Sequence, residues 1–205
     1  MKFIKALFVC AAVMVSLSSN AAFIDFDSSD IKGFANQDVS GSSTVYDFGV
    51  TLGLDGNLWV SITGPFSIDA SSVLYFSFEA LGNEAEIYGI GFDNDMSVTP
   101  GTLFDIGGSQ SNRAIQYADY TVNSGVVDFA IDVGSFFTGT FSKMVFVLDA
   151  DNIGNTSVFF INVELCSDGD LCLTTLAQNS TQVSAPSTIA ILGVLFLASA
   201  FRRRA

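Results

Sequence analysis

The 205-residue chain contains no histidine, and its basic residues are few: eight lysines and arginines stand against 21 aspartates and glutamates. The missing imidazole excludes Ser-His-Asp and Cys-His nucleophile systems and zinc sites with histidine ligands. It also removes the side chain that most often transfers protons near neutral pH. A formal net charge of −13 argues against a nucleic-acid backbone as partner. We therefore expect no nucleic-acid binding and no histidine-based catalysis.

Charged residues are also scarce, at 14%, whereas 49% of the chain is apolar, a balance that argues against general disorder. The N-terminus has the three parts of a secretory signal peptide: a cationic start, an apolar run over residues 6–17 and small residues at 18–22. The run is shorter than the ~20 residues of a spanning helix, so we expect cleavage rather than a retained anchor. Residues 1–21 are the predicted signal peptide.

The C-terminus carries a second sorting feature. The segment 187–201 is apolar but only 15 residues long, and three arginines follow it directly. This order stops translocation and keeps the arginines on the cytoplasmic side of the membrane. We predict a short transmembrane helix in 187–201, preceded by a polar spacer at 177–182. An ordinary tail anchor is the alternative to a signal that is later removed.

Residues 183–205 combine a Val-x-x-Pro-Ser-Thr motif, a Gly-containing apolar segment and an arginine cluster. The residues that form this pattern are Val183, Pro186, Ser187, Thr188, Gly193, Arg202, Arg203 and Arg204. The pattern resembles the PEP-CTERM sorting domain of Gram-negative bacteria, with Ser184 and Ala185 in place of the first proline and the glutamate. The resemblance implies a membrane sorting protease of exosortase type as partner. It also implies an exported protein, held transiently in the inner membrane and then at the cell surface or outside the cell, near extracellular polysaccharide.

Between the two sorting signals, residues 22–176 are long enough for one domain with a sizeable core. All 21 acidic residues lie between the signals, and only Lys32, Arg113 and Lys143 oppose them there. Cys166 and Cys172 flank a turn-rich Asp-Gly segment, and an exported protein meets an oxidising compartment. We predict a disulfide between them, since a thiolate metal site would need more cysteines or histidines.

The hydrophobic pattern of 22–176 indicates short β-strands throughout. Apolar residues alternate with others in 73–80, in 127–133 and in 158–165, and the Asp55-Gly56 pair suggests a tight hairpin. In the third segment, one face of the strand would carry Phe159, Ile161, Val163 and Leu165. We predict an all-β protein, an antiparallel β-sandwich of jelly-roll type, in which most of the 20 phenylalanines fill the space between two sheets.

One loop has the composition of a calcium site. Asp149, Asp151, Asn152 and Asn155 are closely spaced around Gly154, and Ca²⁺ binds six to eight such oxygen ligands. A polar loop whose Asp and Asn side chains make turns is the alternative. Asp93-Asn94-Asp95 is a weaker acidic loop of the same kind. No cofactor other than Ca²⁺ is indicated.

The aromatic residues suggest carbohydrate binding, because aromatic faces stack on pyranose rings. Trp59 is the only tryptophan and is the candidate stacking residue, although a lone Trp in a sandwich more often belongs to the core. The five tyrosines are further candidates for stacking: Tyr46, Tyr75, Tyr88, Tyr117 and Tyr120. Carboxylates are abundant, but abundance does not identify the defined pair that glycoside hydrolysis requires, so no catalytic residue and no enzyme activity is predicted.

The sequence leaves three functions open. The first is a structural or adhesive role with extracellular polysaccharide, as the sorting-signal resemblance implies. The second is a Ca²⁺-assisted carbohydrate-binding module of the same fold, and the third is a small glycan hydrolase. Exposed aromatic side chains on a sheet face would favour the second, and two facing carboxyl groups in a cleft would favour the third.

Overall fold

A computed structural model of the chain describes residues 22–37, 40–110, 114–151 and 154–167. This part consists of β-strands, short 3₁₀ turns and loops, with no α-helix among the described residues, which confirms the all-β prediction. The strands are β1 (Ala22–Phe23), β2 (Lys32–Gly33), β3 (Ser40–Tyr46), β4 (Thr51–Ile68), β5 (Val73–Gly82), β6 (Ile87–Asp93), β7 (Leu103–Gly107), β8 (Ile115–Tyr120), β9 (Val127–Ile131), β10 (Gly139–Asp149) and β11 (Thr156–Cys166). The 3₁₀ turns are η1 (Asp47–Gly49), η2 (Pro100–Thr102) and η3 (Val133–Ser135).

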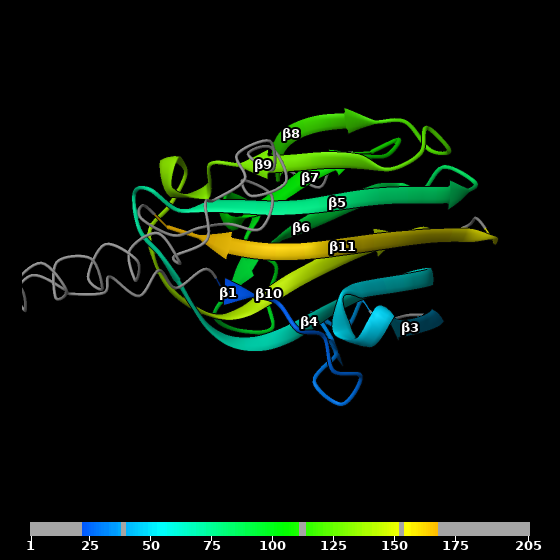
Figure 1. The fold of residues 1–205 in the computed structure, drawn as a ribbon. Coiled ribbons are helices and arrows are strands. Elements are labelled where there is room, and N and C mark those ends of the chain that lie inside the picture. Colours follow the sequence, from blue (N-terminus) through cyan, green and yellow to red (C-terminus); the bar gives the residue numbers. More distant parts are fainter. Residues whose placement is uncertain (1–21, 38–39, 111–113, 152–153, 168–205) are drawn as a thin grey trace, which may run out of the picture. The chain divides into compact units, whose positions relative to one another are not determined.

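The strands form a sandwich of two layers that share one long strand (Figure 1). In what we call the first layer, the order is β3, β4, β11, β5 and β9; in the second it is β2, β4, β10, β6, β7 and β8. The 18-residue β4 belongs to both: residues 51–57 pair with β3, and residues 58–68 pair with β10. Pairing is antiparallel except between β7 and β8, which run parallel. The sheet is therefore mixed at one edge rather than antiparallel throughout.

The hairpin predicted at Asp55-Gly56 was wrong. These residues lie inside β4, and the turn between β3 and β4 falls instead at η1. An Asp-Gly pair favours a left-handed backbone, and Gly56 does have a φ of +97°. The strands also pack closely here, because a Cβ on Gly56 would lie 2.7 Å from the Ser40 carbonyl oxygen. Glycine permits the bend at which β4 passes from the first layer to the second.

The core lies between the layers and is rich in phenylalanine. On β5, Leu74, Phe76 and Phe78 are almost fully buried while the residues between them are half-buried, as the alternation predicted. The Phe78 ring lies 5.2 Å from Phe160 of β11 and 5.0 Å from Tyr120 of β8, centroid to centroid. Phenylalanine therefore spans the space between the two sheets, and burying each ring contributes about 1.5–3 kcal/mol.

One strand departs from the predicted alternation. On β11, the side chains of Val158, Phe160 and Val163 are all fully buried. Strict alternation would place Val158 and Phe160 on the opposite face from Val163. The pairing of β11 with β5 shifts register between Ile161 and Glu164, and Asn162 between them has a φ of +51°. This β-bulge inserts an extra residue and exchanges the two faces of the strand.

Among the described residues, no helix is long and apolar enough to cross a membrane. The predicted signal peptide 1–21, the spacer 177–182, the transmembrane segment 187–201 and the sorting motif all lie outside the described residues. They remain predictions.

Candidate functional site

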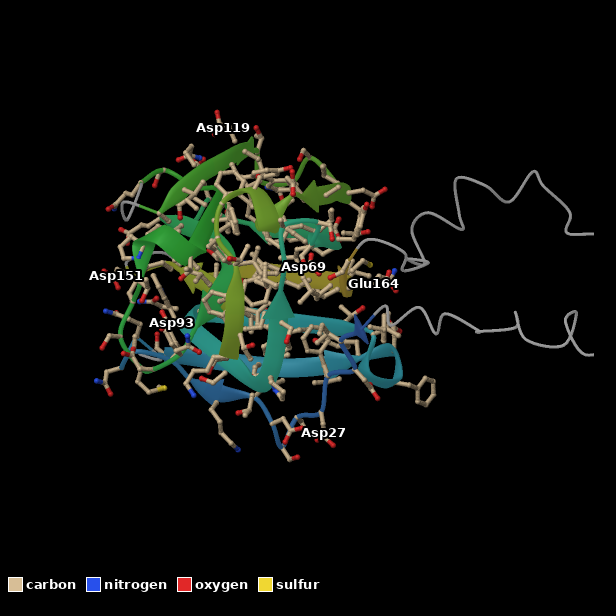
Figure 2. The ribbon with its side chains drawn as sticks, turned by 90° about the vertical axis from the view of Figure 1, so that its left-hand side faces the viewer. Asp27, Asp69, Asp93, Asp119, Asp151 and Glu164 are labelled. Atoms are coloured by element: carbon tan, nitrogen blue, oxygen red, sulfur yellow. The ribbon has the colours of Figure 1, made fainter. Side chains whose placement is uncertain are left out.

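Three carboxylates meet where β10 ends. Asp149 is the last residue of β10, Asp151 follows in the next turn, and Glu86 directly precedes β6. One carboxylate oxygen from each lies within 4.8 Å of the others. Figure 2 labels Asp151 of this group and shows Asp27, Asp69 and Asp119 in other regions of the described part. We call Glu86, Asp149 and Asp151 the acidic cluster.

Backbone pairing and one buried amide position this cluster. The Glu86 amide donates a 2.7 Å hydrogen bond to the Asp149 carbonyl oxygen, which joins the start of β6 to the end of β10. Asn57, buried in β4, donates from Nδ2 to Asp151 Oδ1 at 2.6 Å and accepts from the Ala150 amide at 3.2 Å. The bend of β4 thus holds the turn that carries two of the three carboxylates.

The pKa of Asp149 is raised above its ordinary value, chiefly because burial disfavours the charged carboxylate, and further because Asp151 and Glu86 repel it. The indole N–H of Trp59 lies near enough to the Asp149 carboxylate to favour its charged form. The two groups do not meet at hydrogen-bonding distance and angle. Trp59 Nε1 is therefore buried with no hydrogen-bond partner among the described residues. Burial and like charges outweigh this one favourable contact.

The structure brings together only part of the predicted calcium loop. Asp149 and Asp151 lie in the acidic cluster, whereas Asn152 lies outside the described residues. Asn155 takes a left-handed conformation with a φ of +71°, and its carbonyl oxygen accepts a hydrogen bond from the Asn83 amide. Glu86 was missed, because it is 63 positions before Asp149 in the sequence and reaches it only through strand pairing.

The second acidic loop has a structural explanation. Asp93 is buried, and its Oδ1 accepts hydrogen bonds from the Asn94 and Asp95 amides at 2.7 and 3.2 Å. Its Oδ2 accepts from the Thr99 amide at 3.1 Å. The Asp93 carboxylate therefore satisfies the backbone donors of its own loop, as Asp does in turns.

Trp59 is not a solvent-facing stacking residue, so that prediction was wrong. Its side chain is 4% exposed and lies on the outer side of the second layer, packed in a small cluster beneath the segment that follows β2. Its backbone carbonyl accepts from the Phe34 amide, and its amide donates to the Gln37 carbonyl oxygen. The apolar residues of this cluster are Phe34, Trp59, Ile87, Leu103, Val145 and Val147.

Two aromatic rings lie instead on the outer face of the first layer. Tyr46 of β3 is 42% exposed, and its ring lies 6.0 Å from the half-buried ring of Phe159 on β11, with the planes tilted by 56°. Gly53 of β4 lies between their strands, opposite Phe159. A Cβ on Gly53 would come within 2.7 Å of the Tyr46 ring and 3.2 Å of the Phe159 ring. Only glycine lets both rings rest against the sheet here. We call Tyr46, Gly53 and Phe159 the aromatic platform.

Polar side chains border this platform. Strand register places Glu79 of β5 beside Phe159, and Ser157 Oγ donates to Asp55 Oδ1 one row away. Towards the other edge, Ser77 Oγ donates to Asp128 Oδ1 at 2.6 Å. Rings flanked by carboxylates and hydroxyls suit a sugar, whose apolar ring face stacks while its hydroxyls hydrogen-bond.

A further aromatic side chain follows directly in the sequence. Phe48 in η1 is fully exposed and has a left-handed φ of +56°, next to Asp47 at +53°. Such a conformation costs a non-glycine residue about 1–3 kcal/mol and persists only where its surroundings impose it. Thr51 Oγ1 donates to Asp47 Oδ2 at 3.3 Å and helps hold the turn. The turn therefore presents Phe48 to solvent two residues after Tyr46.

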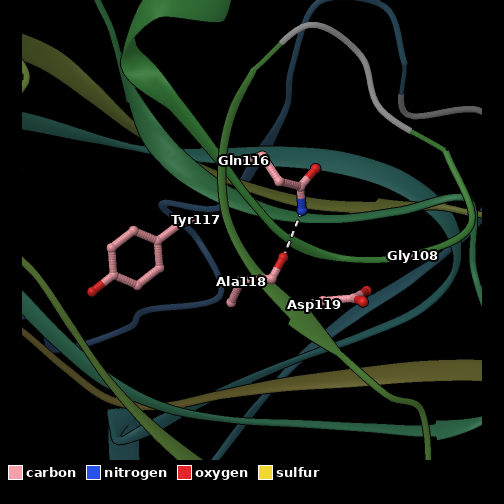
Figure 3. A pocket seen from close by; sticks show the side chains of 5 residues that line it. All are labelled: Gly108, Gln116, Tyr117, Ala118 and Asp119. Atoms are coloured by element: carbon pink, nitrogen blue, oxygen red, sulfur yellow. Dashed lines mark hydrogen bonds between the residues drawn. The ribbon is translucent and has the colours of Figure 1, made fainter.

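Two shallow cavities lie along β8. One, of about 490 Å³, is lined by Gly108, Gln116, Tyr117, Ala118 and Asp119, and Figure 3 shows Tyr117 pointing across β8 from Gln116 and Asp119. The other, of about 310 Å³, shares Ala118 and Asp119. Asp119 is the one carboxylate among the described residues that line these cavities, so those residues do not supply the pair that glycoside hydrolysis requires.

The remaining predicted site residues are the two cysteines. Cys166 is buried at the end of β11, whereas Cys172 lies outside the described residues. Their pairing therefore stays a prediction.

No protein-family model and no curated protein matches the sequence. Among solved structures, a family 29 carbohydrate-binding module is 14% identical, with a TM-score of 0.47, and covers 78% of this chain and 99% of its own. Another family 29 module, from Piromyces equi, is 12% identical at a TM-score of 0.41, covering 80% and 99%. A low-affinity xylan-binding module from Roseburia intestinalis is 14% identical at 0.40, covering 73% and 96%. At such identities and TM-scores, the function has to be argued from this chain's own residues.

Proposed function

We propose that this protein is an exported, non-catalytic β-sandwich that binds polysaccharide through the outer face of its first layer. The aromatic platform carries the proposal: two rings lie side by side on an open sheet face, over a glycine whose replacement would displace them. An open sheet face with exposed rings accepts an extended chain of sugar rings and needs no deep pocket. Phe48, exposed in the turn that follows Tyr46, extends the aromatic surface available to such a chain.

The charge of the platform border limits the ligand. Asp55, Glu79 and Asp128 are carboxylates on or beside this face, and 21 acidic residues stand against eight basic ones in the whole chain. An anionic polysaccharide would be repelled, whereas neutral sugars or amino sugars would be accepted. The proposed ligand is therefore a neutral or amino-sugar polysaccharide.

The sorting signals supply the proposed location. We infer cleavage of residues 1–21, transient insertion of 187–201 in the inner membrane, and processing of the tail by an exosortase-type protease. Mass spectrometry of the mature protein tests this step: loss of Arg202 to Arg204 is expected, and their retention would make the tail an ordinary anchor. Release at the cell surface would place the aromatic platform among extracellular polysaccharides.

Tyr46→Ala is expected to weaken polysaccharide binding about tenfold, because it removes half of the stacking surface. The measurement is affinity electrophoresis or calorimetry with a neutral glucan or xylan and with a chitosan, chosen from a glycan-array screen. Tyr117→Ala is the matched control, since Tyr117 is comparably exposed, at 37%, but lies on β8. Equal affinity of Tyr46→Ala and the parent would refute the platform. A screen with no glycan bound would leave the structural role with matrix polysaccharide as the better proposal.

A further inference from the structure

We propose that Glu86, Asp149 and Asp151 bind one Ca²⁺ ion, with Trp59 and Asn57 as positioning residues that hold the carboxylates in place. The three ligands come from two segments that are far apart in the sequence and joined by strand pairing. The site lies on neither the aromatic platform nor the β8 cavities, so it stands or fails independently of glycan binding.

The spacing of the oxygens fits a single cation. Calcium–oxygen distances are about 2.3–2.6 Å, so two oxygens on one ion can lie up to about 5 Å apart. One oxygen from each carboxylate lies within 4.8 Å of the others. The three groups can therefore contact one ion without rearrangement of the strands that carry them.

The charge at the cluster calls for a cation. The two lysines among the described residues are Lys32 and Lys143, and neither is near in the strand register: Lys143 pairs with Asp93, six residues along β10 from Asp149. Lys32 pairs with Ser61 on β4. The three carboxylates are like charges that the fold holds close together, with one oxygen of each within 4.8 Å of the others. A bound divalent ion would replace this repulsion by attraction.

A second observation comes from Trp59, which is not itself a ligand. Its Nε1–H is buried, has no hydrogen-bond partner among the described residues, and faces Asp149. Once an ion holds one oxygen of Asp149, the other can accept this N–H, which is how hydrogen bonds outside a metal site orient its ligands. Asn57 already does the same for Asp151 through the 2.6 Å bond from Nδ2.

The chemistry of the donors selects calcium. All three ligands are carboxylates, and no histidine exists in the chain to favour zinc or copper. Mg²⁺ requires near-ideal octahedral geometry and gives up its waters reluctantly, whereas Ca²⁺ accepts six to eight irregularly placed oxygens. Asp149 and Asp151 are partly accessible to solvent, so water can complete the coordination.

Terbium luminescence tests the site directly, because Tb³⁺ substitutes for Ca²⁺ and is excited by energy transfer from a nearby indole. Trp59 is the only tryptophan in the chain, so selective excitation of tryptophan reports on Tb³⁺ bound close to Trp59. We expect the full-length protein to sensitise Tb³⁺ emission, and Ca²⁺ to abolish that emission by competition. Absence of sensitised emission, or emission that Ca²⁺ does not displace, would overturn the proposal.

Variants separate ligands from general charge effects. Asp149→Asn and Glu86→Gln are each expected to weaken Tb³⁺ and Ca²⁺ binding at least about tenfold. Glu84→Gln is the matched control, because Glu84 is exposed and lies two residues from Glu86, and the substitution removes the same charge. If Glu84→Gln lost as much affinity, the losses would reflect the general change in charge rather than lost ligands, and the proposed site would be wrong. Circular dichroism in chelator verifies that each variant is folded.

Trp59→Phe tests the positioning role. The variant keeps the ring packing but loses the N–H, so the Ca²⁺ concentration that gives half the rise in melting temperature should increase about tenfold. A purely structural role would lower the melting temperature equally with and without Ca²⁺. That result would contradict the role assigned to the indole N–H.

Discussion

Phe160→Ala is expected to lower the free energy of unfolding by about 3–5 kcal/mol, one of the largest effects available in this chain. Phe160 is fully buried, and its ring lies within 5.2 Å of both Phe78 and Phe146, centroid to centroid. Truncation would remove these contacts and leave a cavity between the layers that the surrounding rings cannot fill. Urea denaturation followed by circular dichroism measures the loss.

Phe159→Ala is the matched control, because the same residue type stands one position earlier on the opposite face of β11. Its half-buried ring contacts Tyr46 on the outer face, and its removal should cost only about 1 kcal/mol. It should also weaken glycan binding, which Phe160→Ala affects only through stability. If Phe159→Ala were the more destabilising of the two, the assignment of faces on β11 would be wrong.

This pair of residues shows how far the sequence could predict the fold. Alternation over 73–80 predicts β5 and its buried face correctly, because a regular strand places every second side chain on the same face. On β11 the same reasoning fails beyond Ile161, because a bulge at Asn162 adds one residue to the strand. Asn is one of the few residues that tolerate a left-handed backbone, but nothing local distinguishes a bulge from an ordinary polar position.

The candidate sites show a similar division. Asp149 and Asp151 could be found from the sequence, since they are two residues apart in one acidic loop. Glu86 could not, because only the pairing of β6 with β10 brings it to them. The aromatic platform was hidden for the same reason: Tyr46, Gly53 and Phe159 belong to three strands, and their neighbourhood depends on register. The sequence singles out Trp59 because it is the only tryptophan, but its burial depends on the segment after β2 that covers it.

Asn57→Ala is expected to lower the free energy of unfolding by about 2–3 kcal/mol in the presence of chelator. Asn57 is 5% exposed, and its amide makes two hydrogen bonds to the turn after β10, one of them to the charged Asp151. Alanine would leave the buried Ala150 amide without this acceptor and Asp151 without its donor. An unsatisfied buried group costs more than a hydrogen bond contributes, because water cannot replace the lost partner.

Asn83→Ala provides the comparison, since Asn83 Nδ2 donates a 2.6 Å hydrogen bond to the Gly154 carbonyl oxygen from an exposed position. Water can replace that bond, so the cost should stay below about 1 kcal/mol. Equal losses in the two variants would show that the bend of β4 does not hold the turn. If the difference is found, Ca²⁺ should restore less stability to Asn57→Ala than to the parent, because Asp151 is no longer held towards the ion. Asn57 would then link the passage of β4 between the layers to the order of the acidic cluster.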